Sequence, residues 1–396
     1  MTAVRLGLVL DGPIAFDGTD YWTNLPMGRY CQRMSRVFGQ IDIYAPLHDQ
    51  ESLGHLPNVE FKIERDWAKI IALPDGGGSV LHEIVRQTRL FSLYSEHFAQ
   101  NDWIVFMGAT SYRLAGLAEA RMRGRAYSLY FASEWEENAP FTYRFGATKG
   151  LGYFLYVKYG KFAEWFGLGG SRFALTAGSA LQTKVAKSGV PTFNTSPRVN
   201  LLLEDCFERE DTCQGETITC LFTGGLITRK GLGYLIEAIA ALRKKGLPIE
   251  LRLAGEGEQR KELEDQVRDL GLEDAVEFLG HITSGSALWD EYRNADIFVL
   301  PTLAEGFPRV LYEAMSQSLP IVTTNVSGIP YLMRDRENAL VIDPQDTKAL
   351  ISAIEAVATQ PELRKRLITQ GMGVVRPVLA TDPGDQLMAL IQDHRD

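Results

Sequence analysis

The sequence predicts an α/β protein made of two doubly wound, Rossmann-like domains with parallel sheets. Short apolar runs that fit buried strands alternate with segments of helical periodicity over most of the 396 residues. Such alternation is typical of parallel sheets covered by helices. The pattern stops between Pro191 and Gly215, where we expect a linker, and resumes at Ile218. The length also suits two domains, since single domains commonly have about 100–200 residues.

The elements of each half follow from these patterns. In the first half, strands are expected at residues 4–10, 40–45, 59–63, 103–107, 127–131 and 173–176, and helices at 25–38, 79–100, 112–123 and 180–187. In the second half, strands are expected at residues 218–222, 250–254, 276–278, 297–300, 321–324 and 339–342. Ligands of such sheets bind at the carboxyl ends of the strands, so we expect the site residues in the loops that follow the strands.

Composition narrows the class of protein. The chain is 45% hydrophobic and 23% charged, which is ordinary for a globular protein. No apolar run approaches about 18 residues, so we expect no membrane-spanning helix, and the apolar start is too short for a signal peptide. The four cysteines lack metal-site spacing, which fits a reducing cytoplasm and predicts no metal.

Charge is unevenly distributed along the chain. Residues 1–200 carry 21 lysine and arginine against 18 acidic residues, whereas the remainder carries 20 against 32. The basic first half favours contact with an anionic membrane surface or a phosphate-bearing acceptor. An uneven scatter of solvated charge is the alternative, and nothing indicates a nucleic-acid partner.

The segment EGFPRVLYEAM, residues 305–315, carries two carboxylates eight positions apart. Glu305 lies on a loop and Glu313 inside the helix that we expect to begin near Pro308, because proline suits a first helical turn. The N–H groups at a helix start favour phosphate, so the amides of Arg309 and Val310 are candidates. Carboxylates accept hydrogen bonds from sugar hydroxyls. A surface glutamate and an ordinary helix-start glutamate are the alternative interpretations.

Two further strand–turn–helix motifs precede this one. In LFTGGLITRKGLGYLIEAI, residues 221–239, Gly225 allows close backbone approach, and Arg229 and Lys230 bring cations suited to a diphosphate. In LRLAGEGEQRKELE, residues 251–264, Gly255 and Gly257 form another tight turn. Solvated surface cations and plain structural turns are the alternatives.

Together, the three motifs resemble the nucleotide-sugar domain of retaining glycosyltransferases of the GT-B fold, family 4. The resemblance spans roughly residues 218–371 and includes the family's paired glutamates. It implies that Glu313 holds ribose hydroxyls, that Glu305 contacts the donor sugar, and that Lys230 binds the diphosphate. The family commonly has an arginine where this chain has Gly225, and Arg229 is expected to supply that charge.

The resemblance also implies the remaining site. On the donor side it adds Gly255, Gly257, His281, and the amides of Gly306 and Phe307. The family's N-terminal histidine is missing, and Ser133 or Glu134 is expected to stand in for it, beside Gly12 and Gly18 of the first loop. The aromatic and basic stretch 141–170 suggests peripheral membrane contact, with an ordinary core helix as the alternative.

These observations lead to an expected function and organisation. The chain is expected to be a metal-independent, cofactor-free, retaining hexosyltransferase (EC 2.4.1.-). It would move a sugar from a UDP- or GDP-linked donor to a glycan or lipid-linked acceptor in bacterial polysaccharide biosynthesis. The expected domains are 1–200 for the acceptor and 201–380 for the donor, with a helix in 381–396 crossing back. A nucleotide-sugar 2-epimerase and a non-catalytic glycan-binding scaffold are the alternatives.

Overall fold

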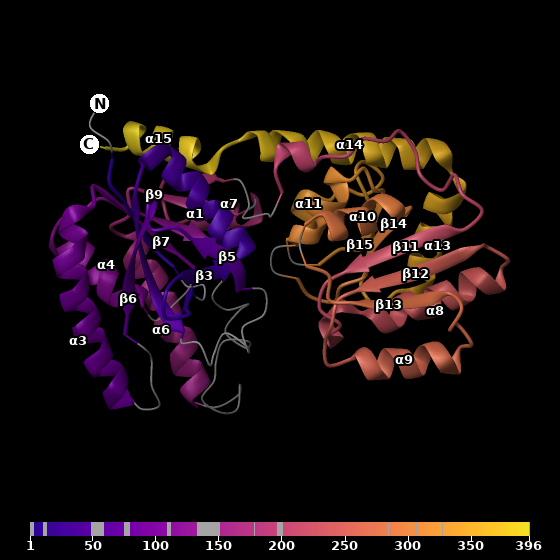
Figure 1. The fold of residues 1–396 in the computed structure, drawn as a ribbon, viewed down its shortest axis with the longest axis horizontal. Helices are drawn as coiled ribbons and strands as arrows, with labels where there is room; N and C mark the ends of the chain where they lie inside the picture. The colour runs from indigo at the N-terminus through magenta and orange to yellow at the C-terminus, as the bar shows by residue number, and fades with distance from the viewer. Residues whose placement is uncertain are drawn as a thin grey trace. The chain divides into compact units, whose positions relative to one another are not determined.

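The computed structural model describes residues 4–10, 14–48, 59–74, 80–108, 112–132, 151–177, 179–195, 201–283, 285–305, 308–326 and 328–395. The chain divides into two compact units, one formed by Met1–Asn200 with Thr381–Asp396 and the other by Leu201–Ala380. Figure 1 shows both units in ribbon form. We refer to them as the first unit and the second unit.

The first unit is built on one large sheet. Its described strands are β1 (Leu6–Val9), β2 (Ile14–Phe16), β3 (Tyr21–Asn24), β4 (Ile41–His48), β5 (Val59–Ile63), β6 (Ala68–Leu73), β7 (Trp103–Met107), β8 (Tyr127–Phe131), β9 (Phe173–Thr176) and β10 (Thr192–Asn194). They lie in the order β10-β9-β8-β7-β1-β4-β2-β3-β5, and β6 also pairs with β4. Strands β1, β7, β8 and β9 are buried along their whole length, as expected for a parallel sheet covered on both faces.

The described helices of this unit are α1 (Leu25–Phe38), α3 (Val80–His97), α4 (Arg113–Met122), α6 (Leu151–Leu168), α7 (Ser179–Ala186) and α15 (Pro383–Asp393). Helix α1 begins as predicted, because the Asn24 side chain accepts a hydrogen bond from the Met27 N–H at 3.0 Å. Aromatic rings fill the core between helices and sheet, with Tyr94 stacked on Phe98 and Phe106 edge-on to Tyr127.

One edge of this sheet departs from the parallel pattern that the sequence predicts. Strand β3 runs antiparallel to both β2 and β5. The β2–β3 turn is held by Asp17, whose carboxylate accepts the N–H groups of Thr19 and Asp20, both at 2.8 Å. Gly18 provides the positive φ that the turn requires, at +98°. The prediction treated this segment as a loop and missed both strands, as it missed β6 and, within the expected linker, β10.

Helix α15, which follows the second unit in sequence, packs on α1 of the first unit. The Arg33 guanidinium donates to the Asp382 carboxylate at 3.1 Å. Leu387 and Ile391 are buried, and the His394 ring lies edge-on to Phe173 at 5.3 Å. These contacts make the last helix part of the core of the first unit.

The second unit has a fully parallel sheet. Its strands are β11 (Ile218–Thr223), β12 (Ile249–Ala254), β13 (Val276–Gly280), β14 (Ile297–Leu300), β15 (Ile321–Thr324) and β16 (Leu340–Ile342). Their order is β13-β12-β11-β14-β15-β16, and every pairing is parallel. All six strands confirm the sequence prediction to within a residue or two.

Helices cover this sheet, and several of them pack against one another. They are α8 (Leu232–Lys244), α9 (Arg260–Asp269), α10 (Ser286–Asn294), α11 (Arg309–Ser316), α12 (Ile329–Leu332), α13 (Thr347–Thr359) and α14 (Pro361–Ala380). Helix α8 packs against α9 and α13, and α11 packs against α14 (Figure 1). None of the helices in the described ranges is long and apolar enough to span a bilayer.

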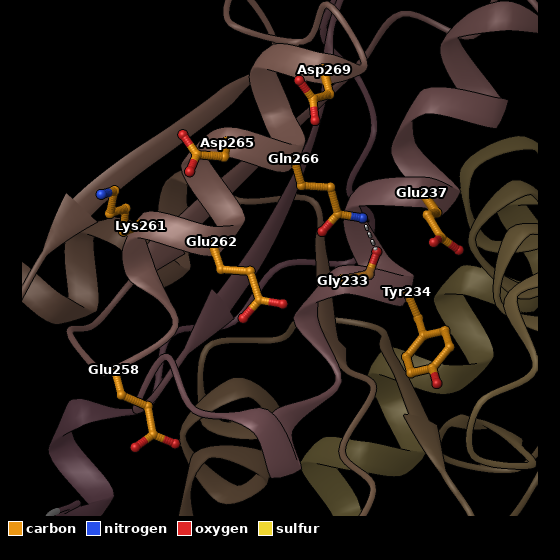
Figure 2. Close-up of a pocket in the computed structure, with 9 residues that line it drawn as sticks. All are labelled: Gly233, Tyr234, Glu237, Glu258, Lys261, Glu262, Asp265, Gln266 and Asp269. Atoms are coloured by element: carbon orange, nitrogen blue, oxygen red, sulfur yellow. Dashed lines mark hydrogen bonds between the residues drawn. The ribbon is translucent and has the colours of Figure 1, made fainter.

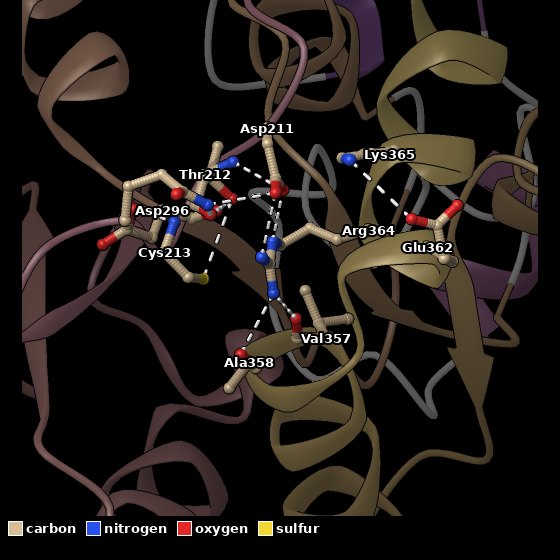
Figure 3. Close-up of polar contacts among 10 residues, drawn as sticks. Asp211, Thr212, Cys213, Asp296, Val357, Ala358, Glu362, Arg364 and Lys365 are labelled. Carbon is tan, nitrogen blue, oxygen red and sulfur yellow. Dashed lines mark hydrogen bonds and ion pairs between the residues drawn. The ribbon is translucent and has the colours of Figure 1, made fainter.

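A buried arginine fastens the start of the second unit to its helices (Figure 3). Arg364 forms two hydrogen bonds with the Asp211 carboxylate, at 2.6 and 3.2 Å, and donates to the carbonyls of Val357 and Ala358 at the end of α13. Asp296 in turn accepts the N–H groups of Cys213 and Thr219. The segment before β11 is therefore a packed part of the second unit.

Candidate active site

The strand order of the second unit identifies where a ligand would bind. The first strand, β11, lies in the middle of the sheet, with β12 on one side and β14 on the other. Successive connections therefore leave in opposite directions from β11 and β14, and open α/β sheets bind ligands at the carboxyl ends of strands at such a point. The loops after β11 and β14 carry Lys230 and Glu305, respectively.

These two loops bring three predicted site residues together. The Lys230 ammonium forms an ion pair with Oε2 of Glu305, and Arg229 Nη1 lies 3.5 Å from Oε1 of the same carboxylate. The Lys230 and Glu305 side chains are only 10% and 8% exposed, whereas Arg229 is 36% exposed. The cluster has two cations against one carboxylate, so it retains a net positive charge to offer an anion.

Backbone contacts hold the two loops in register. The Thr302 hydroxyl donates to the Arg229 carbonyl at 3.0 Å, and the Leu303 N–H donates to the same carbonyl at 2.7 Å. Gly231 permits this close approach, because it has a φ of +66° and a Cβ there would lie 2.3 Å from the Pro301 carbonyl oxygen. The position of Lys230 is thus fixed by the chain itself.

Burial also affects the pKa of Lys230. Removal from water lowers the pKa of its ammonium group, the neighbouring Glu305 raises that pKa, and Arg229 lowers it, with a net shift downward. A diphosphate entering beside Lys230 would add negative charge and favour the protonated form. Binding of a diphosphate would therefore offset the effect of burial on Lys230 and keep its ammonium group charged.

Glu313, on α11, belongs to a second polar cluster at the end of β11. The Tyr292 hydroxyl donates to Glu313 Oε2 at 2.8 Å. Its oxygen lies 2.6 Å from the Thr223 hydroxyl, which must be the donor in that pair because the single proton of Tyr292 is already used. Tyr292 is fully buried on α10. The hydrogen bond from buried Tyr292 therefore fixes the orientation of the half-buried Glu313 carboxylate.

The environment of Glu313 shifts the pKa of its carboxyl upward. Burial raises the pKa of the carboxyl, while the hydrogen bond from Tyr292 and the charge of Arg309 lower it, and burial prevails. Tyr292 itself stays protonated, since burial and the nearby carboxylate raise the pKa of its hydroxyl. Tyr292 and Thr223 did not appear among the predicted site residues. The burial of Tyr292 could be guessed from helical periodicity, but its pairing with Glu313 depends on the packing of α10 beside α11.

Gly255 and Gly257 allow two loops of the second unit to approach each other closely. A Cβ on Gly255 would lie 1.8 Å from the Gly224 carbonyl oxygen, and one on Gly257 would lie 2.2 Å from the Leu226 carbonyl oxygen. The loops after β11 and β12 therefore touch directly, and this contact explains both glycines without a ligand. Their predicted role in admitting a nucleotide stays a prediction. Gly225 differs from them, because the nearest atom to a Cβ there is 3.8 Å away.

The start of α11 is close to its predicted place. Pro308 is the residue just before the helix, and Arg309 is its first residue. The Leu311 N–H donates to the Pro308 carbonyl at 3.1 Å, so this amide is already used. Arg309 is exposed and Val310 is half-buried. The preceding Gly306 and Phe307 lie outside the described residues.

The other predicted residues are not assembled around this site by any described contact. His281 is exposed just after β13, and Gly18 is exposed in the β2–β3 turn. Gly12, Ser133, Glu134 and residues 141–150 lie outside the described ranges. Their roles remain predictions. Among the described residues, no group of three or more His, Cys, Asp and Glu side chains is placed to hold a metal ion.

A separate cavity of about 820 Å³ opens between α8 and α9 (Figure 2). It is lined by Gly233, Tyr234, Glu237, Glu258, Lys261, Glu262, Asp265, Gln266 and Asp269. Carboxylates predominate on this lining, and they would repel a diphosphate. The cluster of Arg229, Lys230 and Glu305 therefore fits an anionic ligand better than this cavity does.

The second unit resembles known proteins in sequence. Residues 207–373 match the family described as glycosyl transferases group 1. The chain is 35% identical over 153 residues to the lipopolysaccharide core biosynthesis glycosyltransferase LpsE of Rhizobium meliloti, covering 37% of this chain and 42% of that protein. It is 33% identical over 139 residues to the putative colanic acid biosynthesis glycosyltransferase WcaL of Escherichia coli, covering 33% and 34%. The aligned part spans less than half the length of these curated relatives.

Solved structures resemble nearly the whole chain in fold. Sucrose-phosphate synthase from Thermosynechococcus elongatus superposes with a TM-score of 0.72 at 16% identity, over 98% of each chain. Anabaena HepE in complex with UDP superposes with a TM-score of 0.70 at 14% identity, over 98% of this chain and 99% of that one. The chain therefore has the GT-B fold, as the sequence predicted, and its second unit carries the group 1 domain.

Proposed function

We propose that this chain is a glycosyltransferase that takes a sugar from a nucleotide-sugar donor bound to the second unit. The observation that carries the proposal is the cluster of Arg229, Lys230 and Glu305 at the point where β11 and β14 diverge. Glu313 lies on the helix that follows the β14 loop, held by Tyr292. The two cations of this cluster suit a diphosphate, and the oriented carboxylate of Glu313 suits ribose hydroxyls.

The proposed chemistry is electrostatic. As the bond between the sugar and the diphosphate breaks, negative charge grows on the leaving group, and Lys230 and Arg229 stabilise it. The chain's own cations do this work in our proposal, without a metal ion. Glu305 keeps Lys230 in place and, since a carboxylate can accept several hydrogen bonds, can also accept one from a donor-sugar hydroxyl. The family resemblance supports membership of family 4 and transfer with retention. In such a transfer the acceptor hydroxyl attacks from the side that the diphosphate leaves, and its proton passes to the leaving phosphate.

The proposed acceptor is a glycan or lipid-linked glycan of bacterial polysaccharide or lipopolysaccharide synthesis. Relatives named for lipopolysaccharide core and colanic acid synthesis support this class. The proposed donor carries UDP or GDP, and the complex of HepE with UDP favours UDP as the first nucleotide to test. The proposal places the acceptor on the first unit.

Nucleotide-induced thermal stabilisation tests the donor site. The wild type is unfolded with UDP, GDP or ADP in buffer containing EDTA. A nucleotide at about 100 times its dissociation constant should stabilise the protein by about 2.7 kcal/mol. Glu313→Ala and Lys230→Ala should lose this stabilisation. Glu262→Ala, which removes an exposed glutamate of the same unit from the lining of the α8–α9 cavity, should keep it.

The outcomes separate the parts of the proposal. No stabilisation by any nucleotide would overturn the donor site, and loss in Glu262→Ala would move the site to the cavity of Figure 2. Stabilisation that requires Mg²⁺ would refute the metal-independent reaction. Retention is tested separately by the anomeric configuration of the product, measured by NMR, and an inverted product would refute it.

A further inference from the structure

Helix α6 (Leu151–Leu168) presents large aromatic side chains to solvent on one face. Phe154 is 55% exposed, Phe162 is 49% exposed and Trp165 is 70% exposed, the largest value for any aromatic residue in the described part of the chain. Residues three and four positions apart lie on the same side of a helix. The spacing of these residues, with Lys158 and Lys161 between them, therefore defines a single surface, which we call the aromatic–lysine face.

The opposite side of α6 fixes which way this face points. Ala163 is buried, and a Cβ on Gly167 would lie 3.0 Å from the Leu117 side chain of α4. The Tyr127 hydroxyl at the start of β8 donates to the Gly167 carbonyl at 2.7 Å. Because these contacts hold α6 against the core of the first unit, the aromatic–lysine face is its outer side.

The rings and one of the lysines of this face contact one another. The Phe162 and Trp165 ring centroids are 5.9 Å apart, and the Lys158 ammonium lies 5.3 Å from the Phe154 ring centroid. Glu164, the one acidic residue in the sequence of α6, is half-buried and is not part of the face. The exposed side of the helix thus combines three large rings with two lysines.

This combination identifies the chemistry of the partner. Tryptophan and phenylalanine favour the boundary between headgroups and acyl chains, and lysine can extend its ammonium to anionic headgroups while its methylenes stay in apolar surroundings. A second copy of the same face would instead bring lysines against lysines. We propose that the aromatic–lysine face of α6 docks on a bilayer that contains anionic phospholipids. This inference concerns the first unit and does not depend on the proposed donor site.

Vesicle co-sedimentation of the whole chain tests the proposal. The wild type should sediment with vesicles of phosphatidylcholine mixed with phosphatidylglycerol and much less with phosphatidylcholine alone. In the double variant Phe162→Ala with Trp165→Ala, the partition coefficient onto vesicles should fall at least about tenfold for each ring removed. The double variant Lys158→Gln with Lys161→Gln should lose about fivefold per lysine at low salt.

Controls separate docking from damage to the fold. Leu270→Ala removes an exposed apolar side chain of the second unit and should leave partitioning unchanged. All variants should keep the wild-type melting temperature, since the altered side chains lie outside the core. Trp165→Phe should still bind vesicles but lose part of the blue shift of tryptophan emission that accompanies binding.

Three results would overturn the proposal. The wild type could fail to sediment with the anionic vesicles, or the aromatic double variant could bind as well as the wild type. The wild type could also form a dimer that the aromatic double variant disrupts, which would make the face an interface between copies. Nucleotide stabilisation is measured independently, so failure of the donor site would be visible as a separate result.

Discussion

Replacing Tyr292 with phenylalanine would remove one oxygen atom from the centre of the candidate site. That oxygen donates to Glu313 at 2.8 Å and accepts from Thr223 at 2.6 Å, and both Tyr292 and Thr223 are buried. A hydrogen bond to a charged group contributes about 1.5–3 kcal/mol, whereas one between neutral groups contributes about 1 kcal/mol. The ring would remain in place, so the change is confined to polar contacts. At neutral pH we expect a loss of about 2–4 kcal/mol in the free energy of unfolding of the second unit.

The size of this loss should depend on pH. Burial raises the pKa of Glu313 in the folded protein, so above the ordinary pKa of a glutamate the folded state binds more protons than the unfolded state. The contribution of Glu313 to stability therefore falls as the pH rises through that window. The Tyr292 hydrogen bond lowers this pKa, so its removal raises the pKa further and extends the window upward. The destabilisation by Tyr292→Phe should accordingly be larger at about pH 8 than at about pH 4.5.

Urea unfolding of wild type and variant across this pH range, followed by far-ultraviolet circular dichroism, measures the effect. The same samples should show weaker nucleotide binding by the variant, with the largest loss between the Glu313 pKa values of the two proteins, where the variant carboxyl is protonated and the wild-type carboxyl is ionised. Tyr127→Phe is the matched control, because it removes a buried hydroxyl that donates to a neutral carbonyl at 2.7 Å. Its cost should not change with pH. A destabilisation by Tyr292→Phe that is equally independent of pH would refute the assignment of Glu313 as its charged partner.

Three other substitutions test the geometry. Gly225→Arg should tighten nucleoside diphosphate binding about tenfold, as measured by calorimetry, because a guanidinium suits phosphate. The side chain has room, since the nearest atom to a Cβ at this position is 3.8 Å away. Unchanged affinity would place the diphosphate elsewhere. Gly231→Ala should lower the melting temperature and weaken binding, because its Cβ would lie 2.3 Å from the Pro301 carbonyl oxygen; a variant as stable as wild type would contradict the described turn. Arg364→Leu removes the buried guanidinium and leaves the half-buried Asp211 without its cation, which should lower the free energy of unfolding in urea by about 3 kcal/mol. A neutral effect would show that this pair does not hold the segment.

The second unit could be predicted from sequence more completely than the first. Its strands are continuous apolar runs such as Ile297–Leu300 and Ile321–Thr324, and burial on both faces makes such runs easy to recognise. In the first unit, β2 and β10 have three residues each, too few to show a period. The antiparallel direction of β3 depends on the turn built by Asp17, which a search for strand–helix alternation does not detect.

The candidate site was predictable in part for a similar reason. Lys230, Glu305 and Glu313 each stand in a strand–turn–helix motif, so their side chains could be nominated from local pattern. The pairing of Lys230 with Glu305 spans 75 positions and depends on sheet order, which local pattern does not give. Tyr292 lies in no motif, and its role arises from the packing of α10. Gly255 and Gly257 are required where two backbone loops touch, a contact that local pattern does not reveal, and their role toward a ligand stays a prediction.

Because α15 belongs to the core of the first unit, the order of synthesis on the ribosome differs from the order of folding. Leu201–Ala380 is a continuous stretch and can complete its fold as soon as it leaves the exit tunnel. The first unit is translated earlier but must wait for Thr381–Asp396, and until then the surface of α1 on which α15 packs stays uncovered. A chain whose translation stops before residue 381 would therefore hold a finished second unit beside a first unit with exposed apolar side chains, a state that chaperones and proteases recognise.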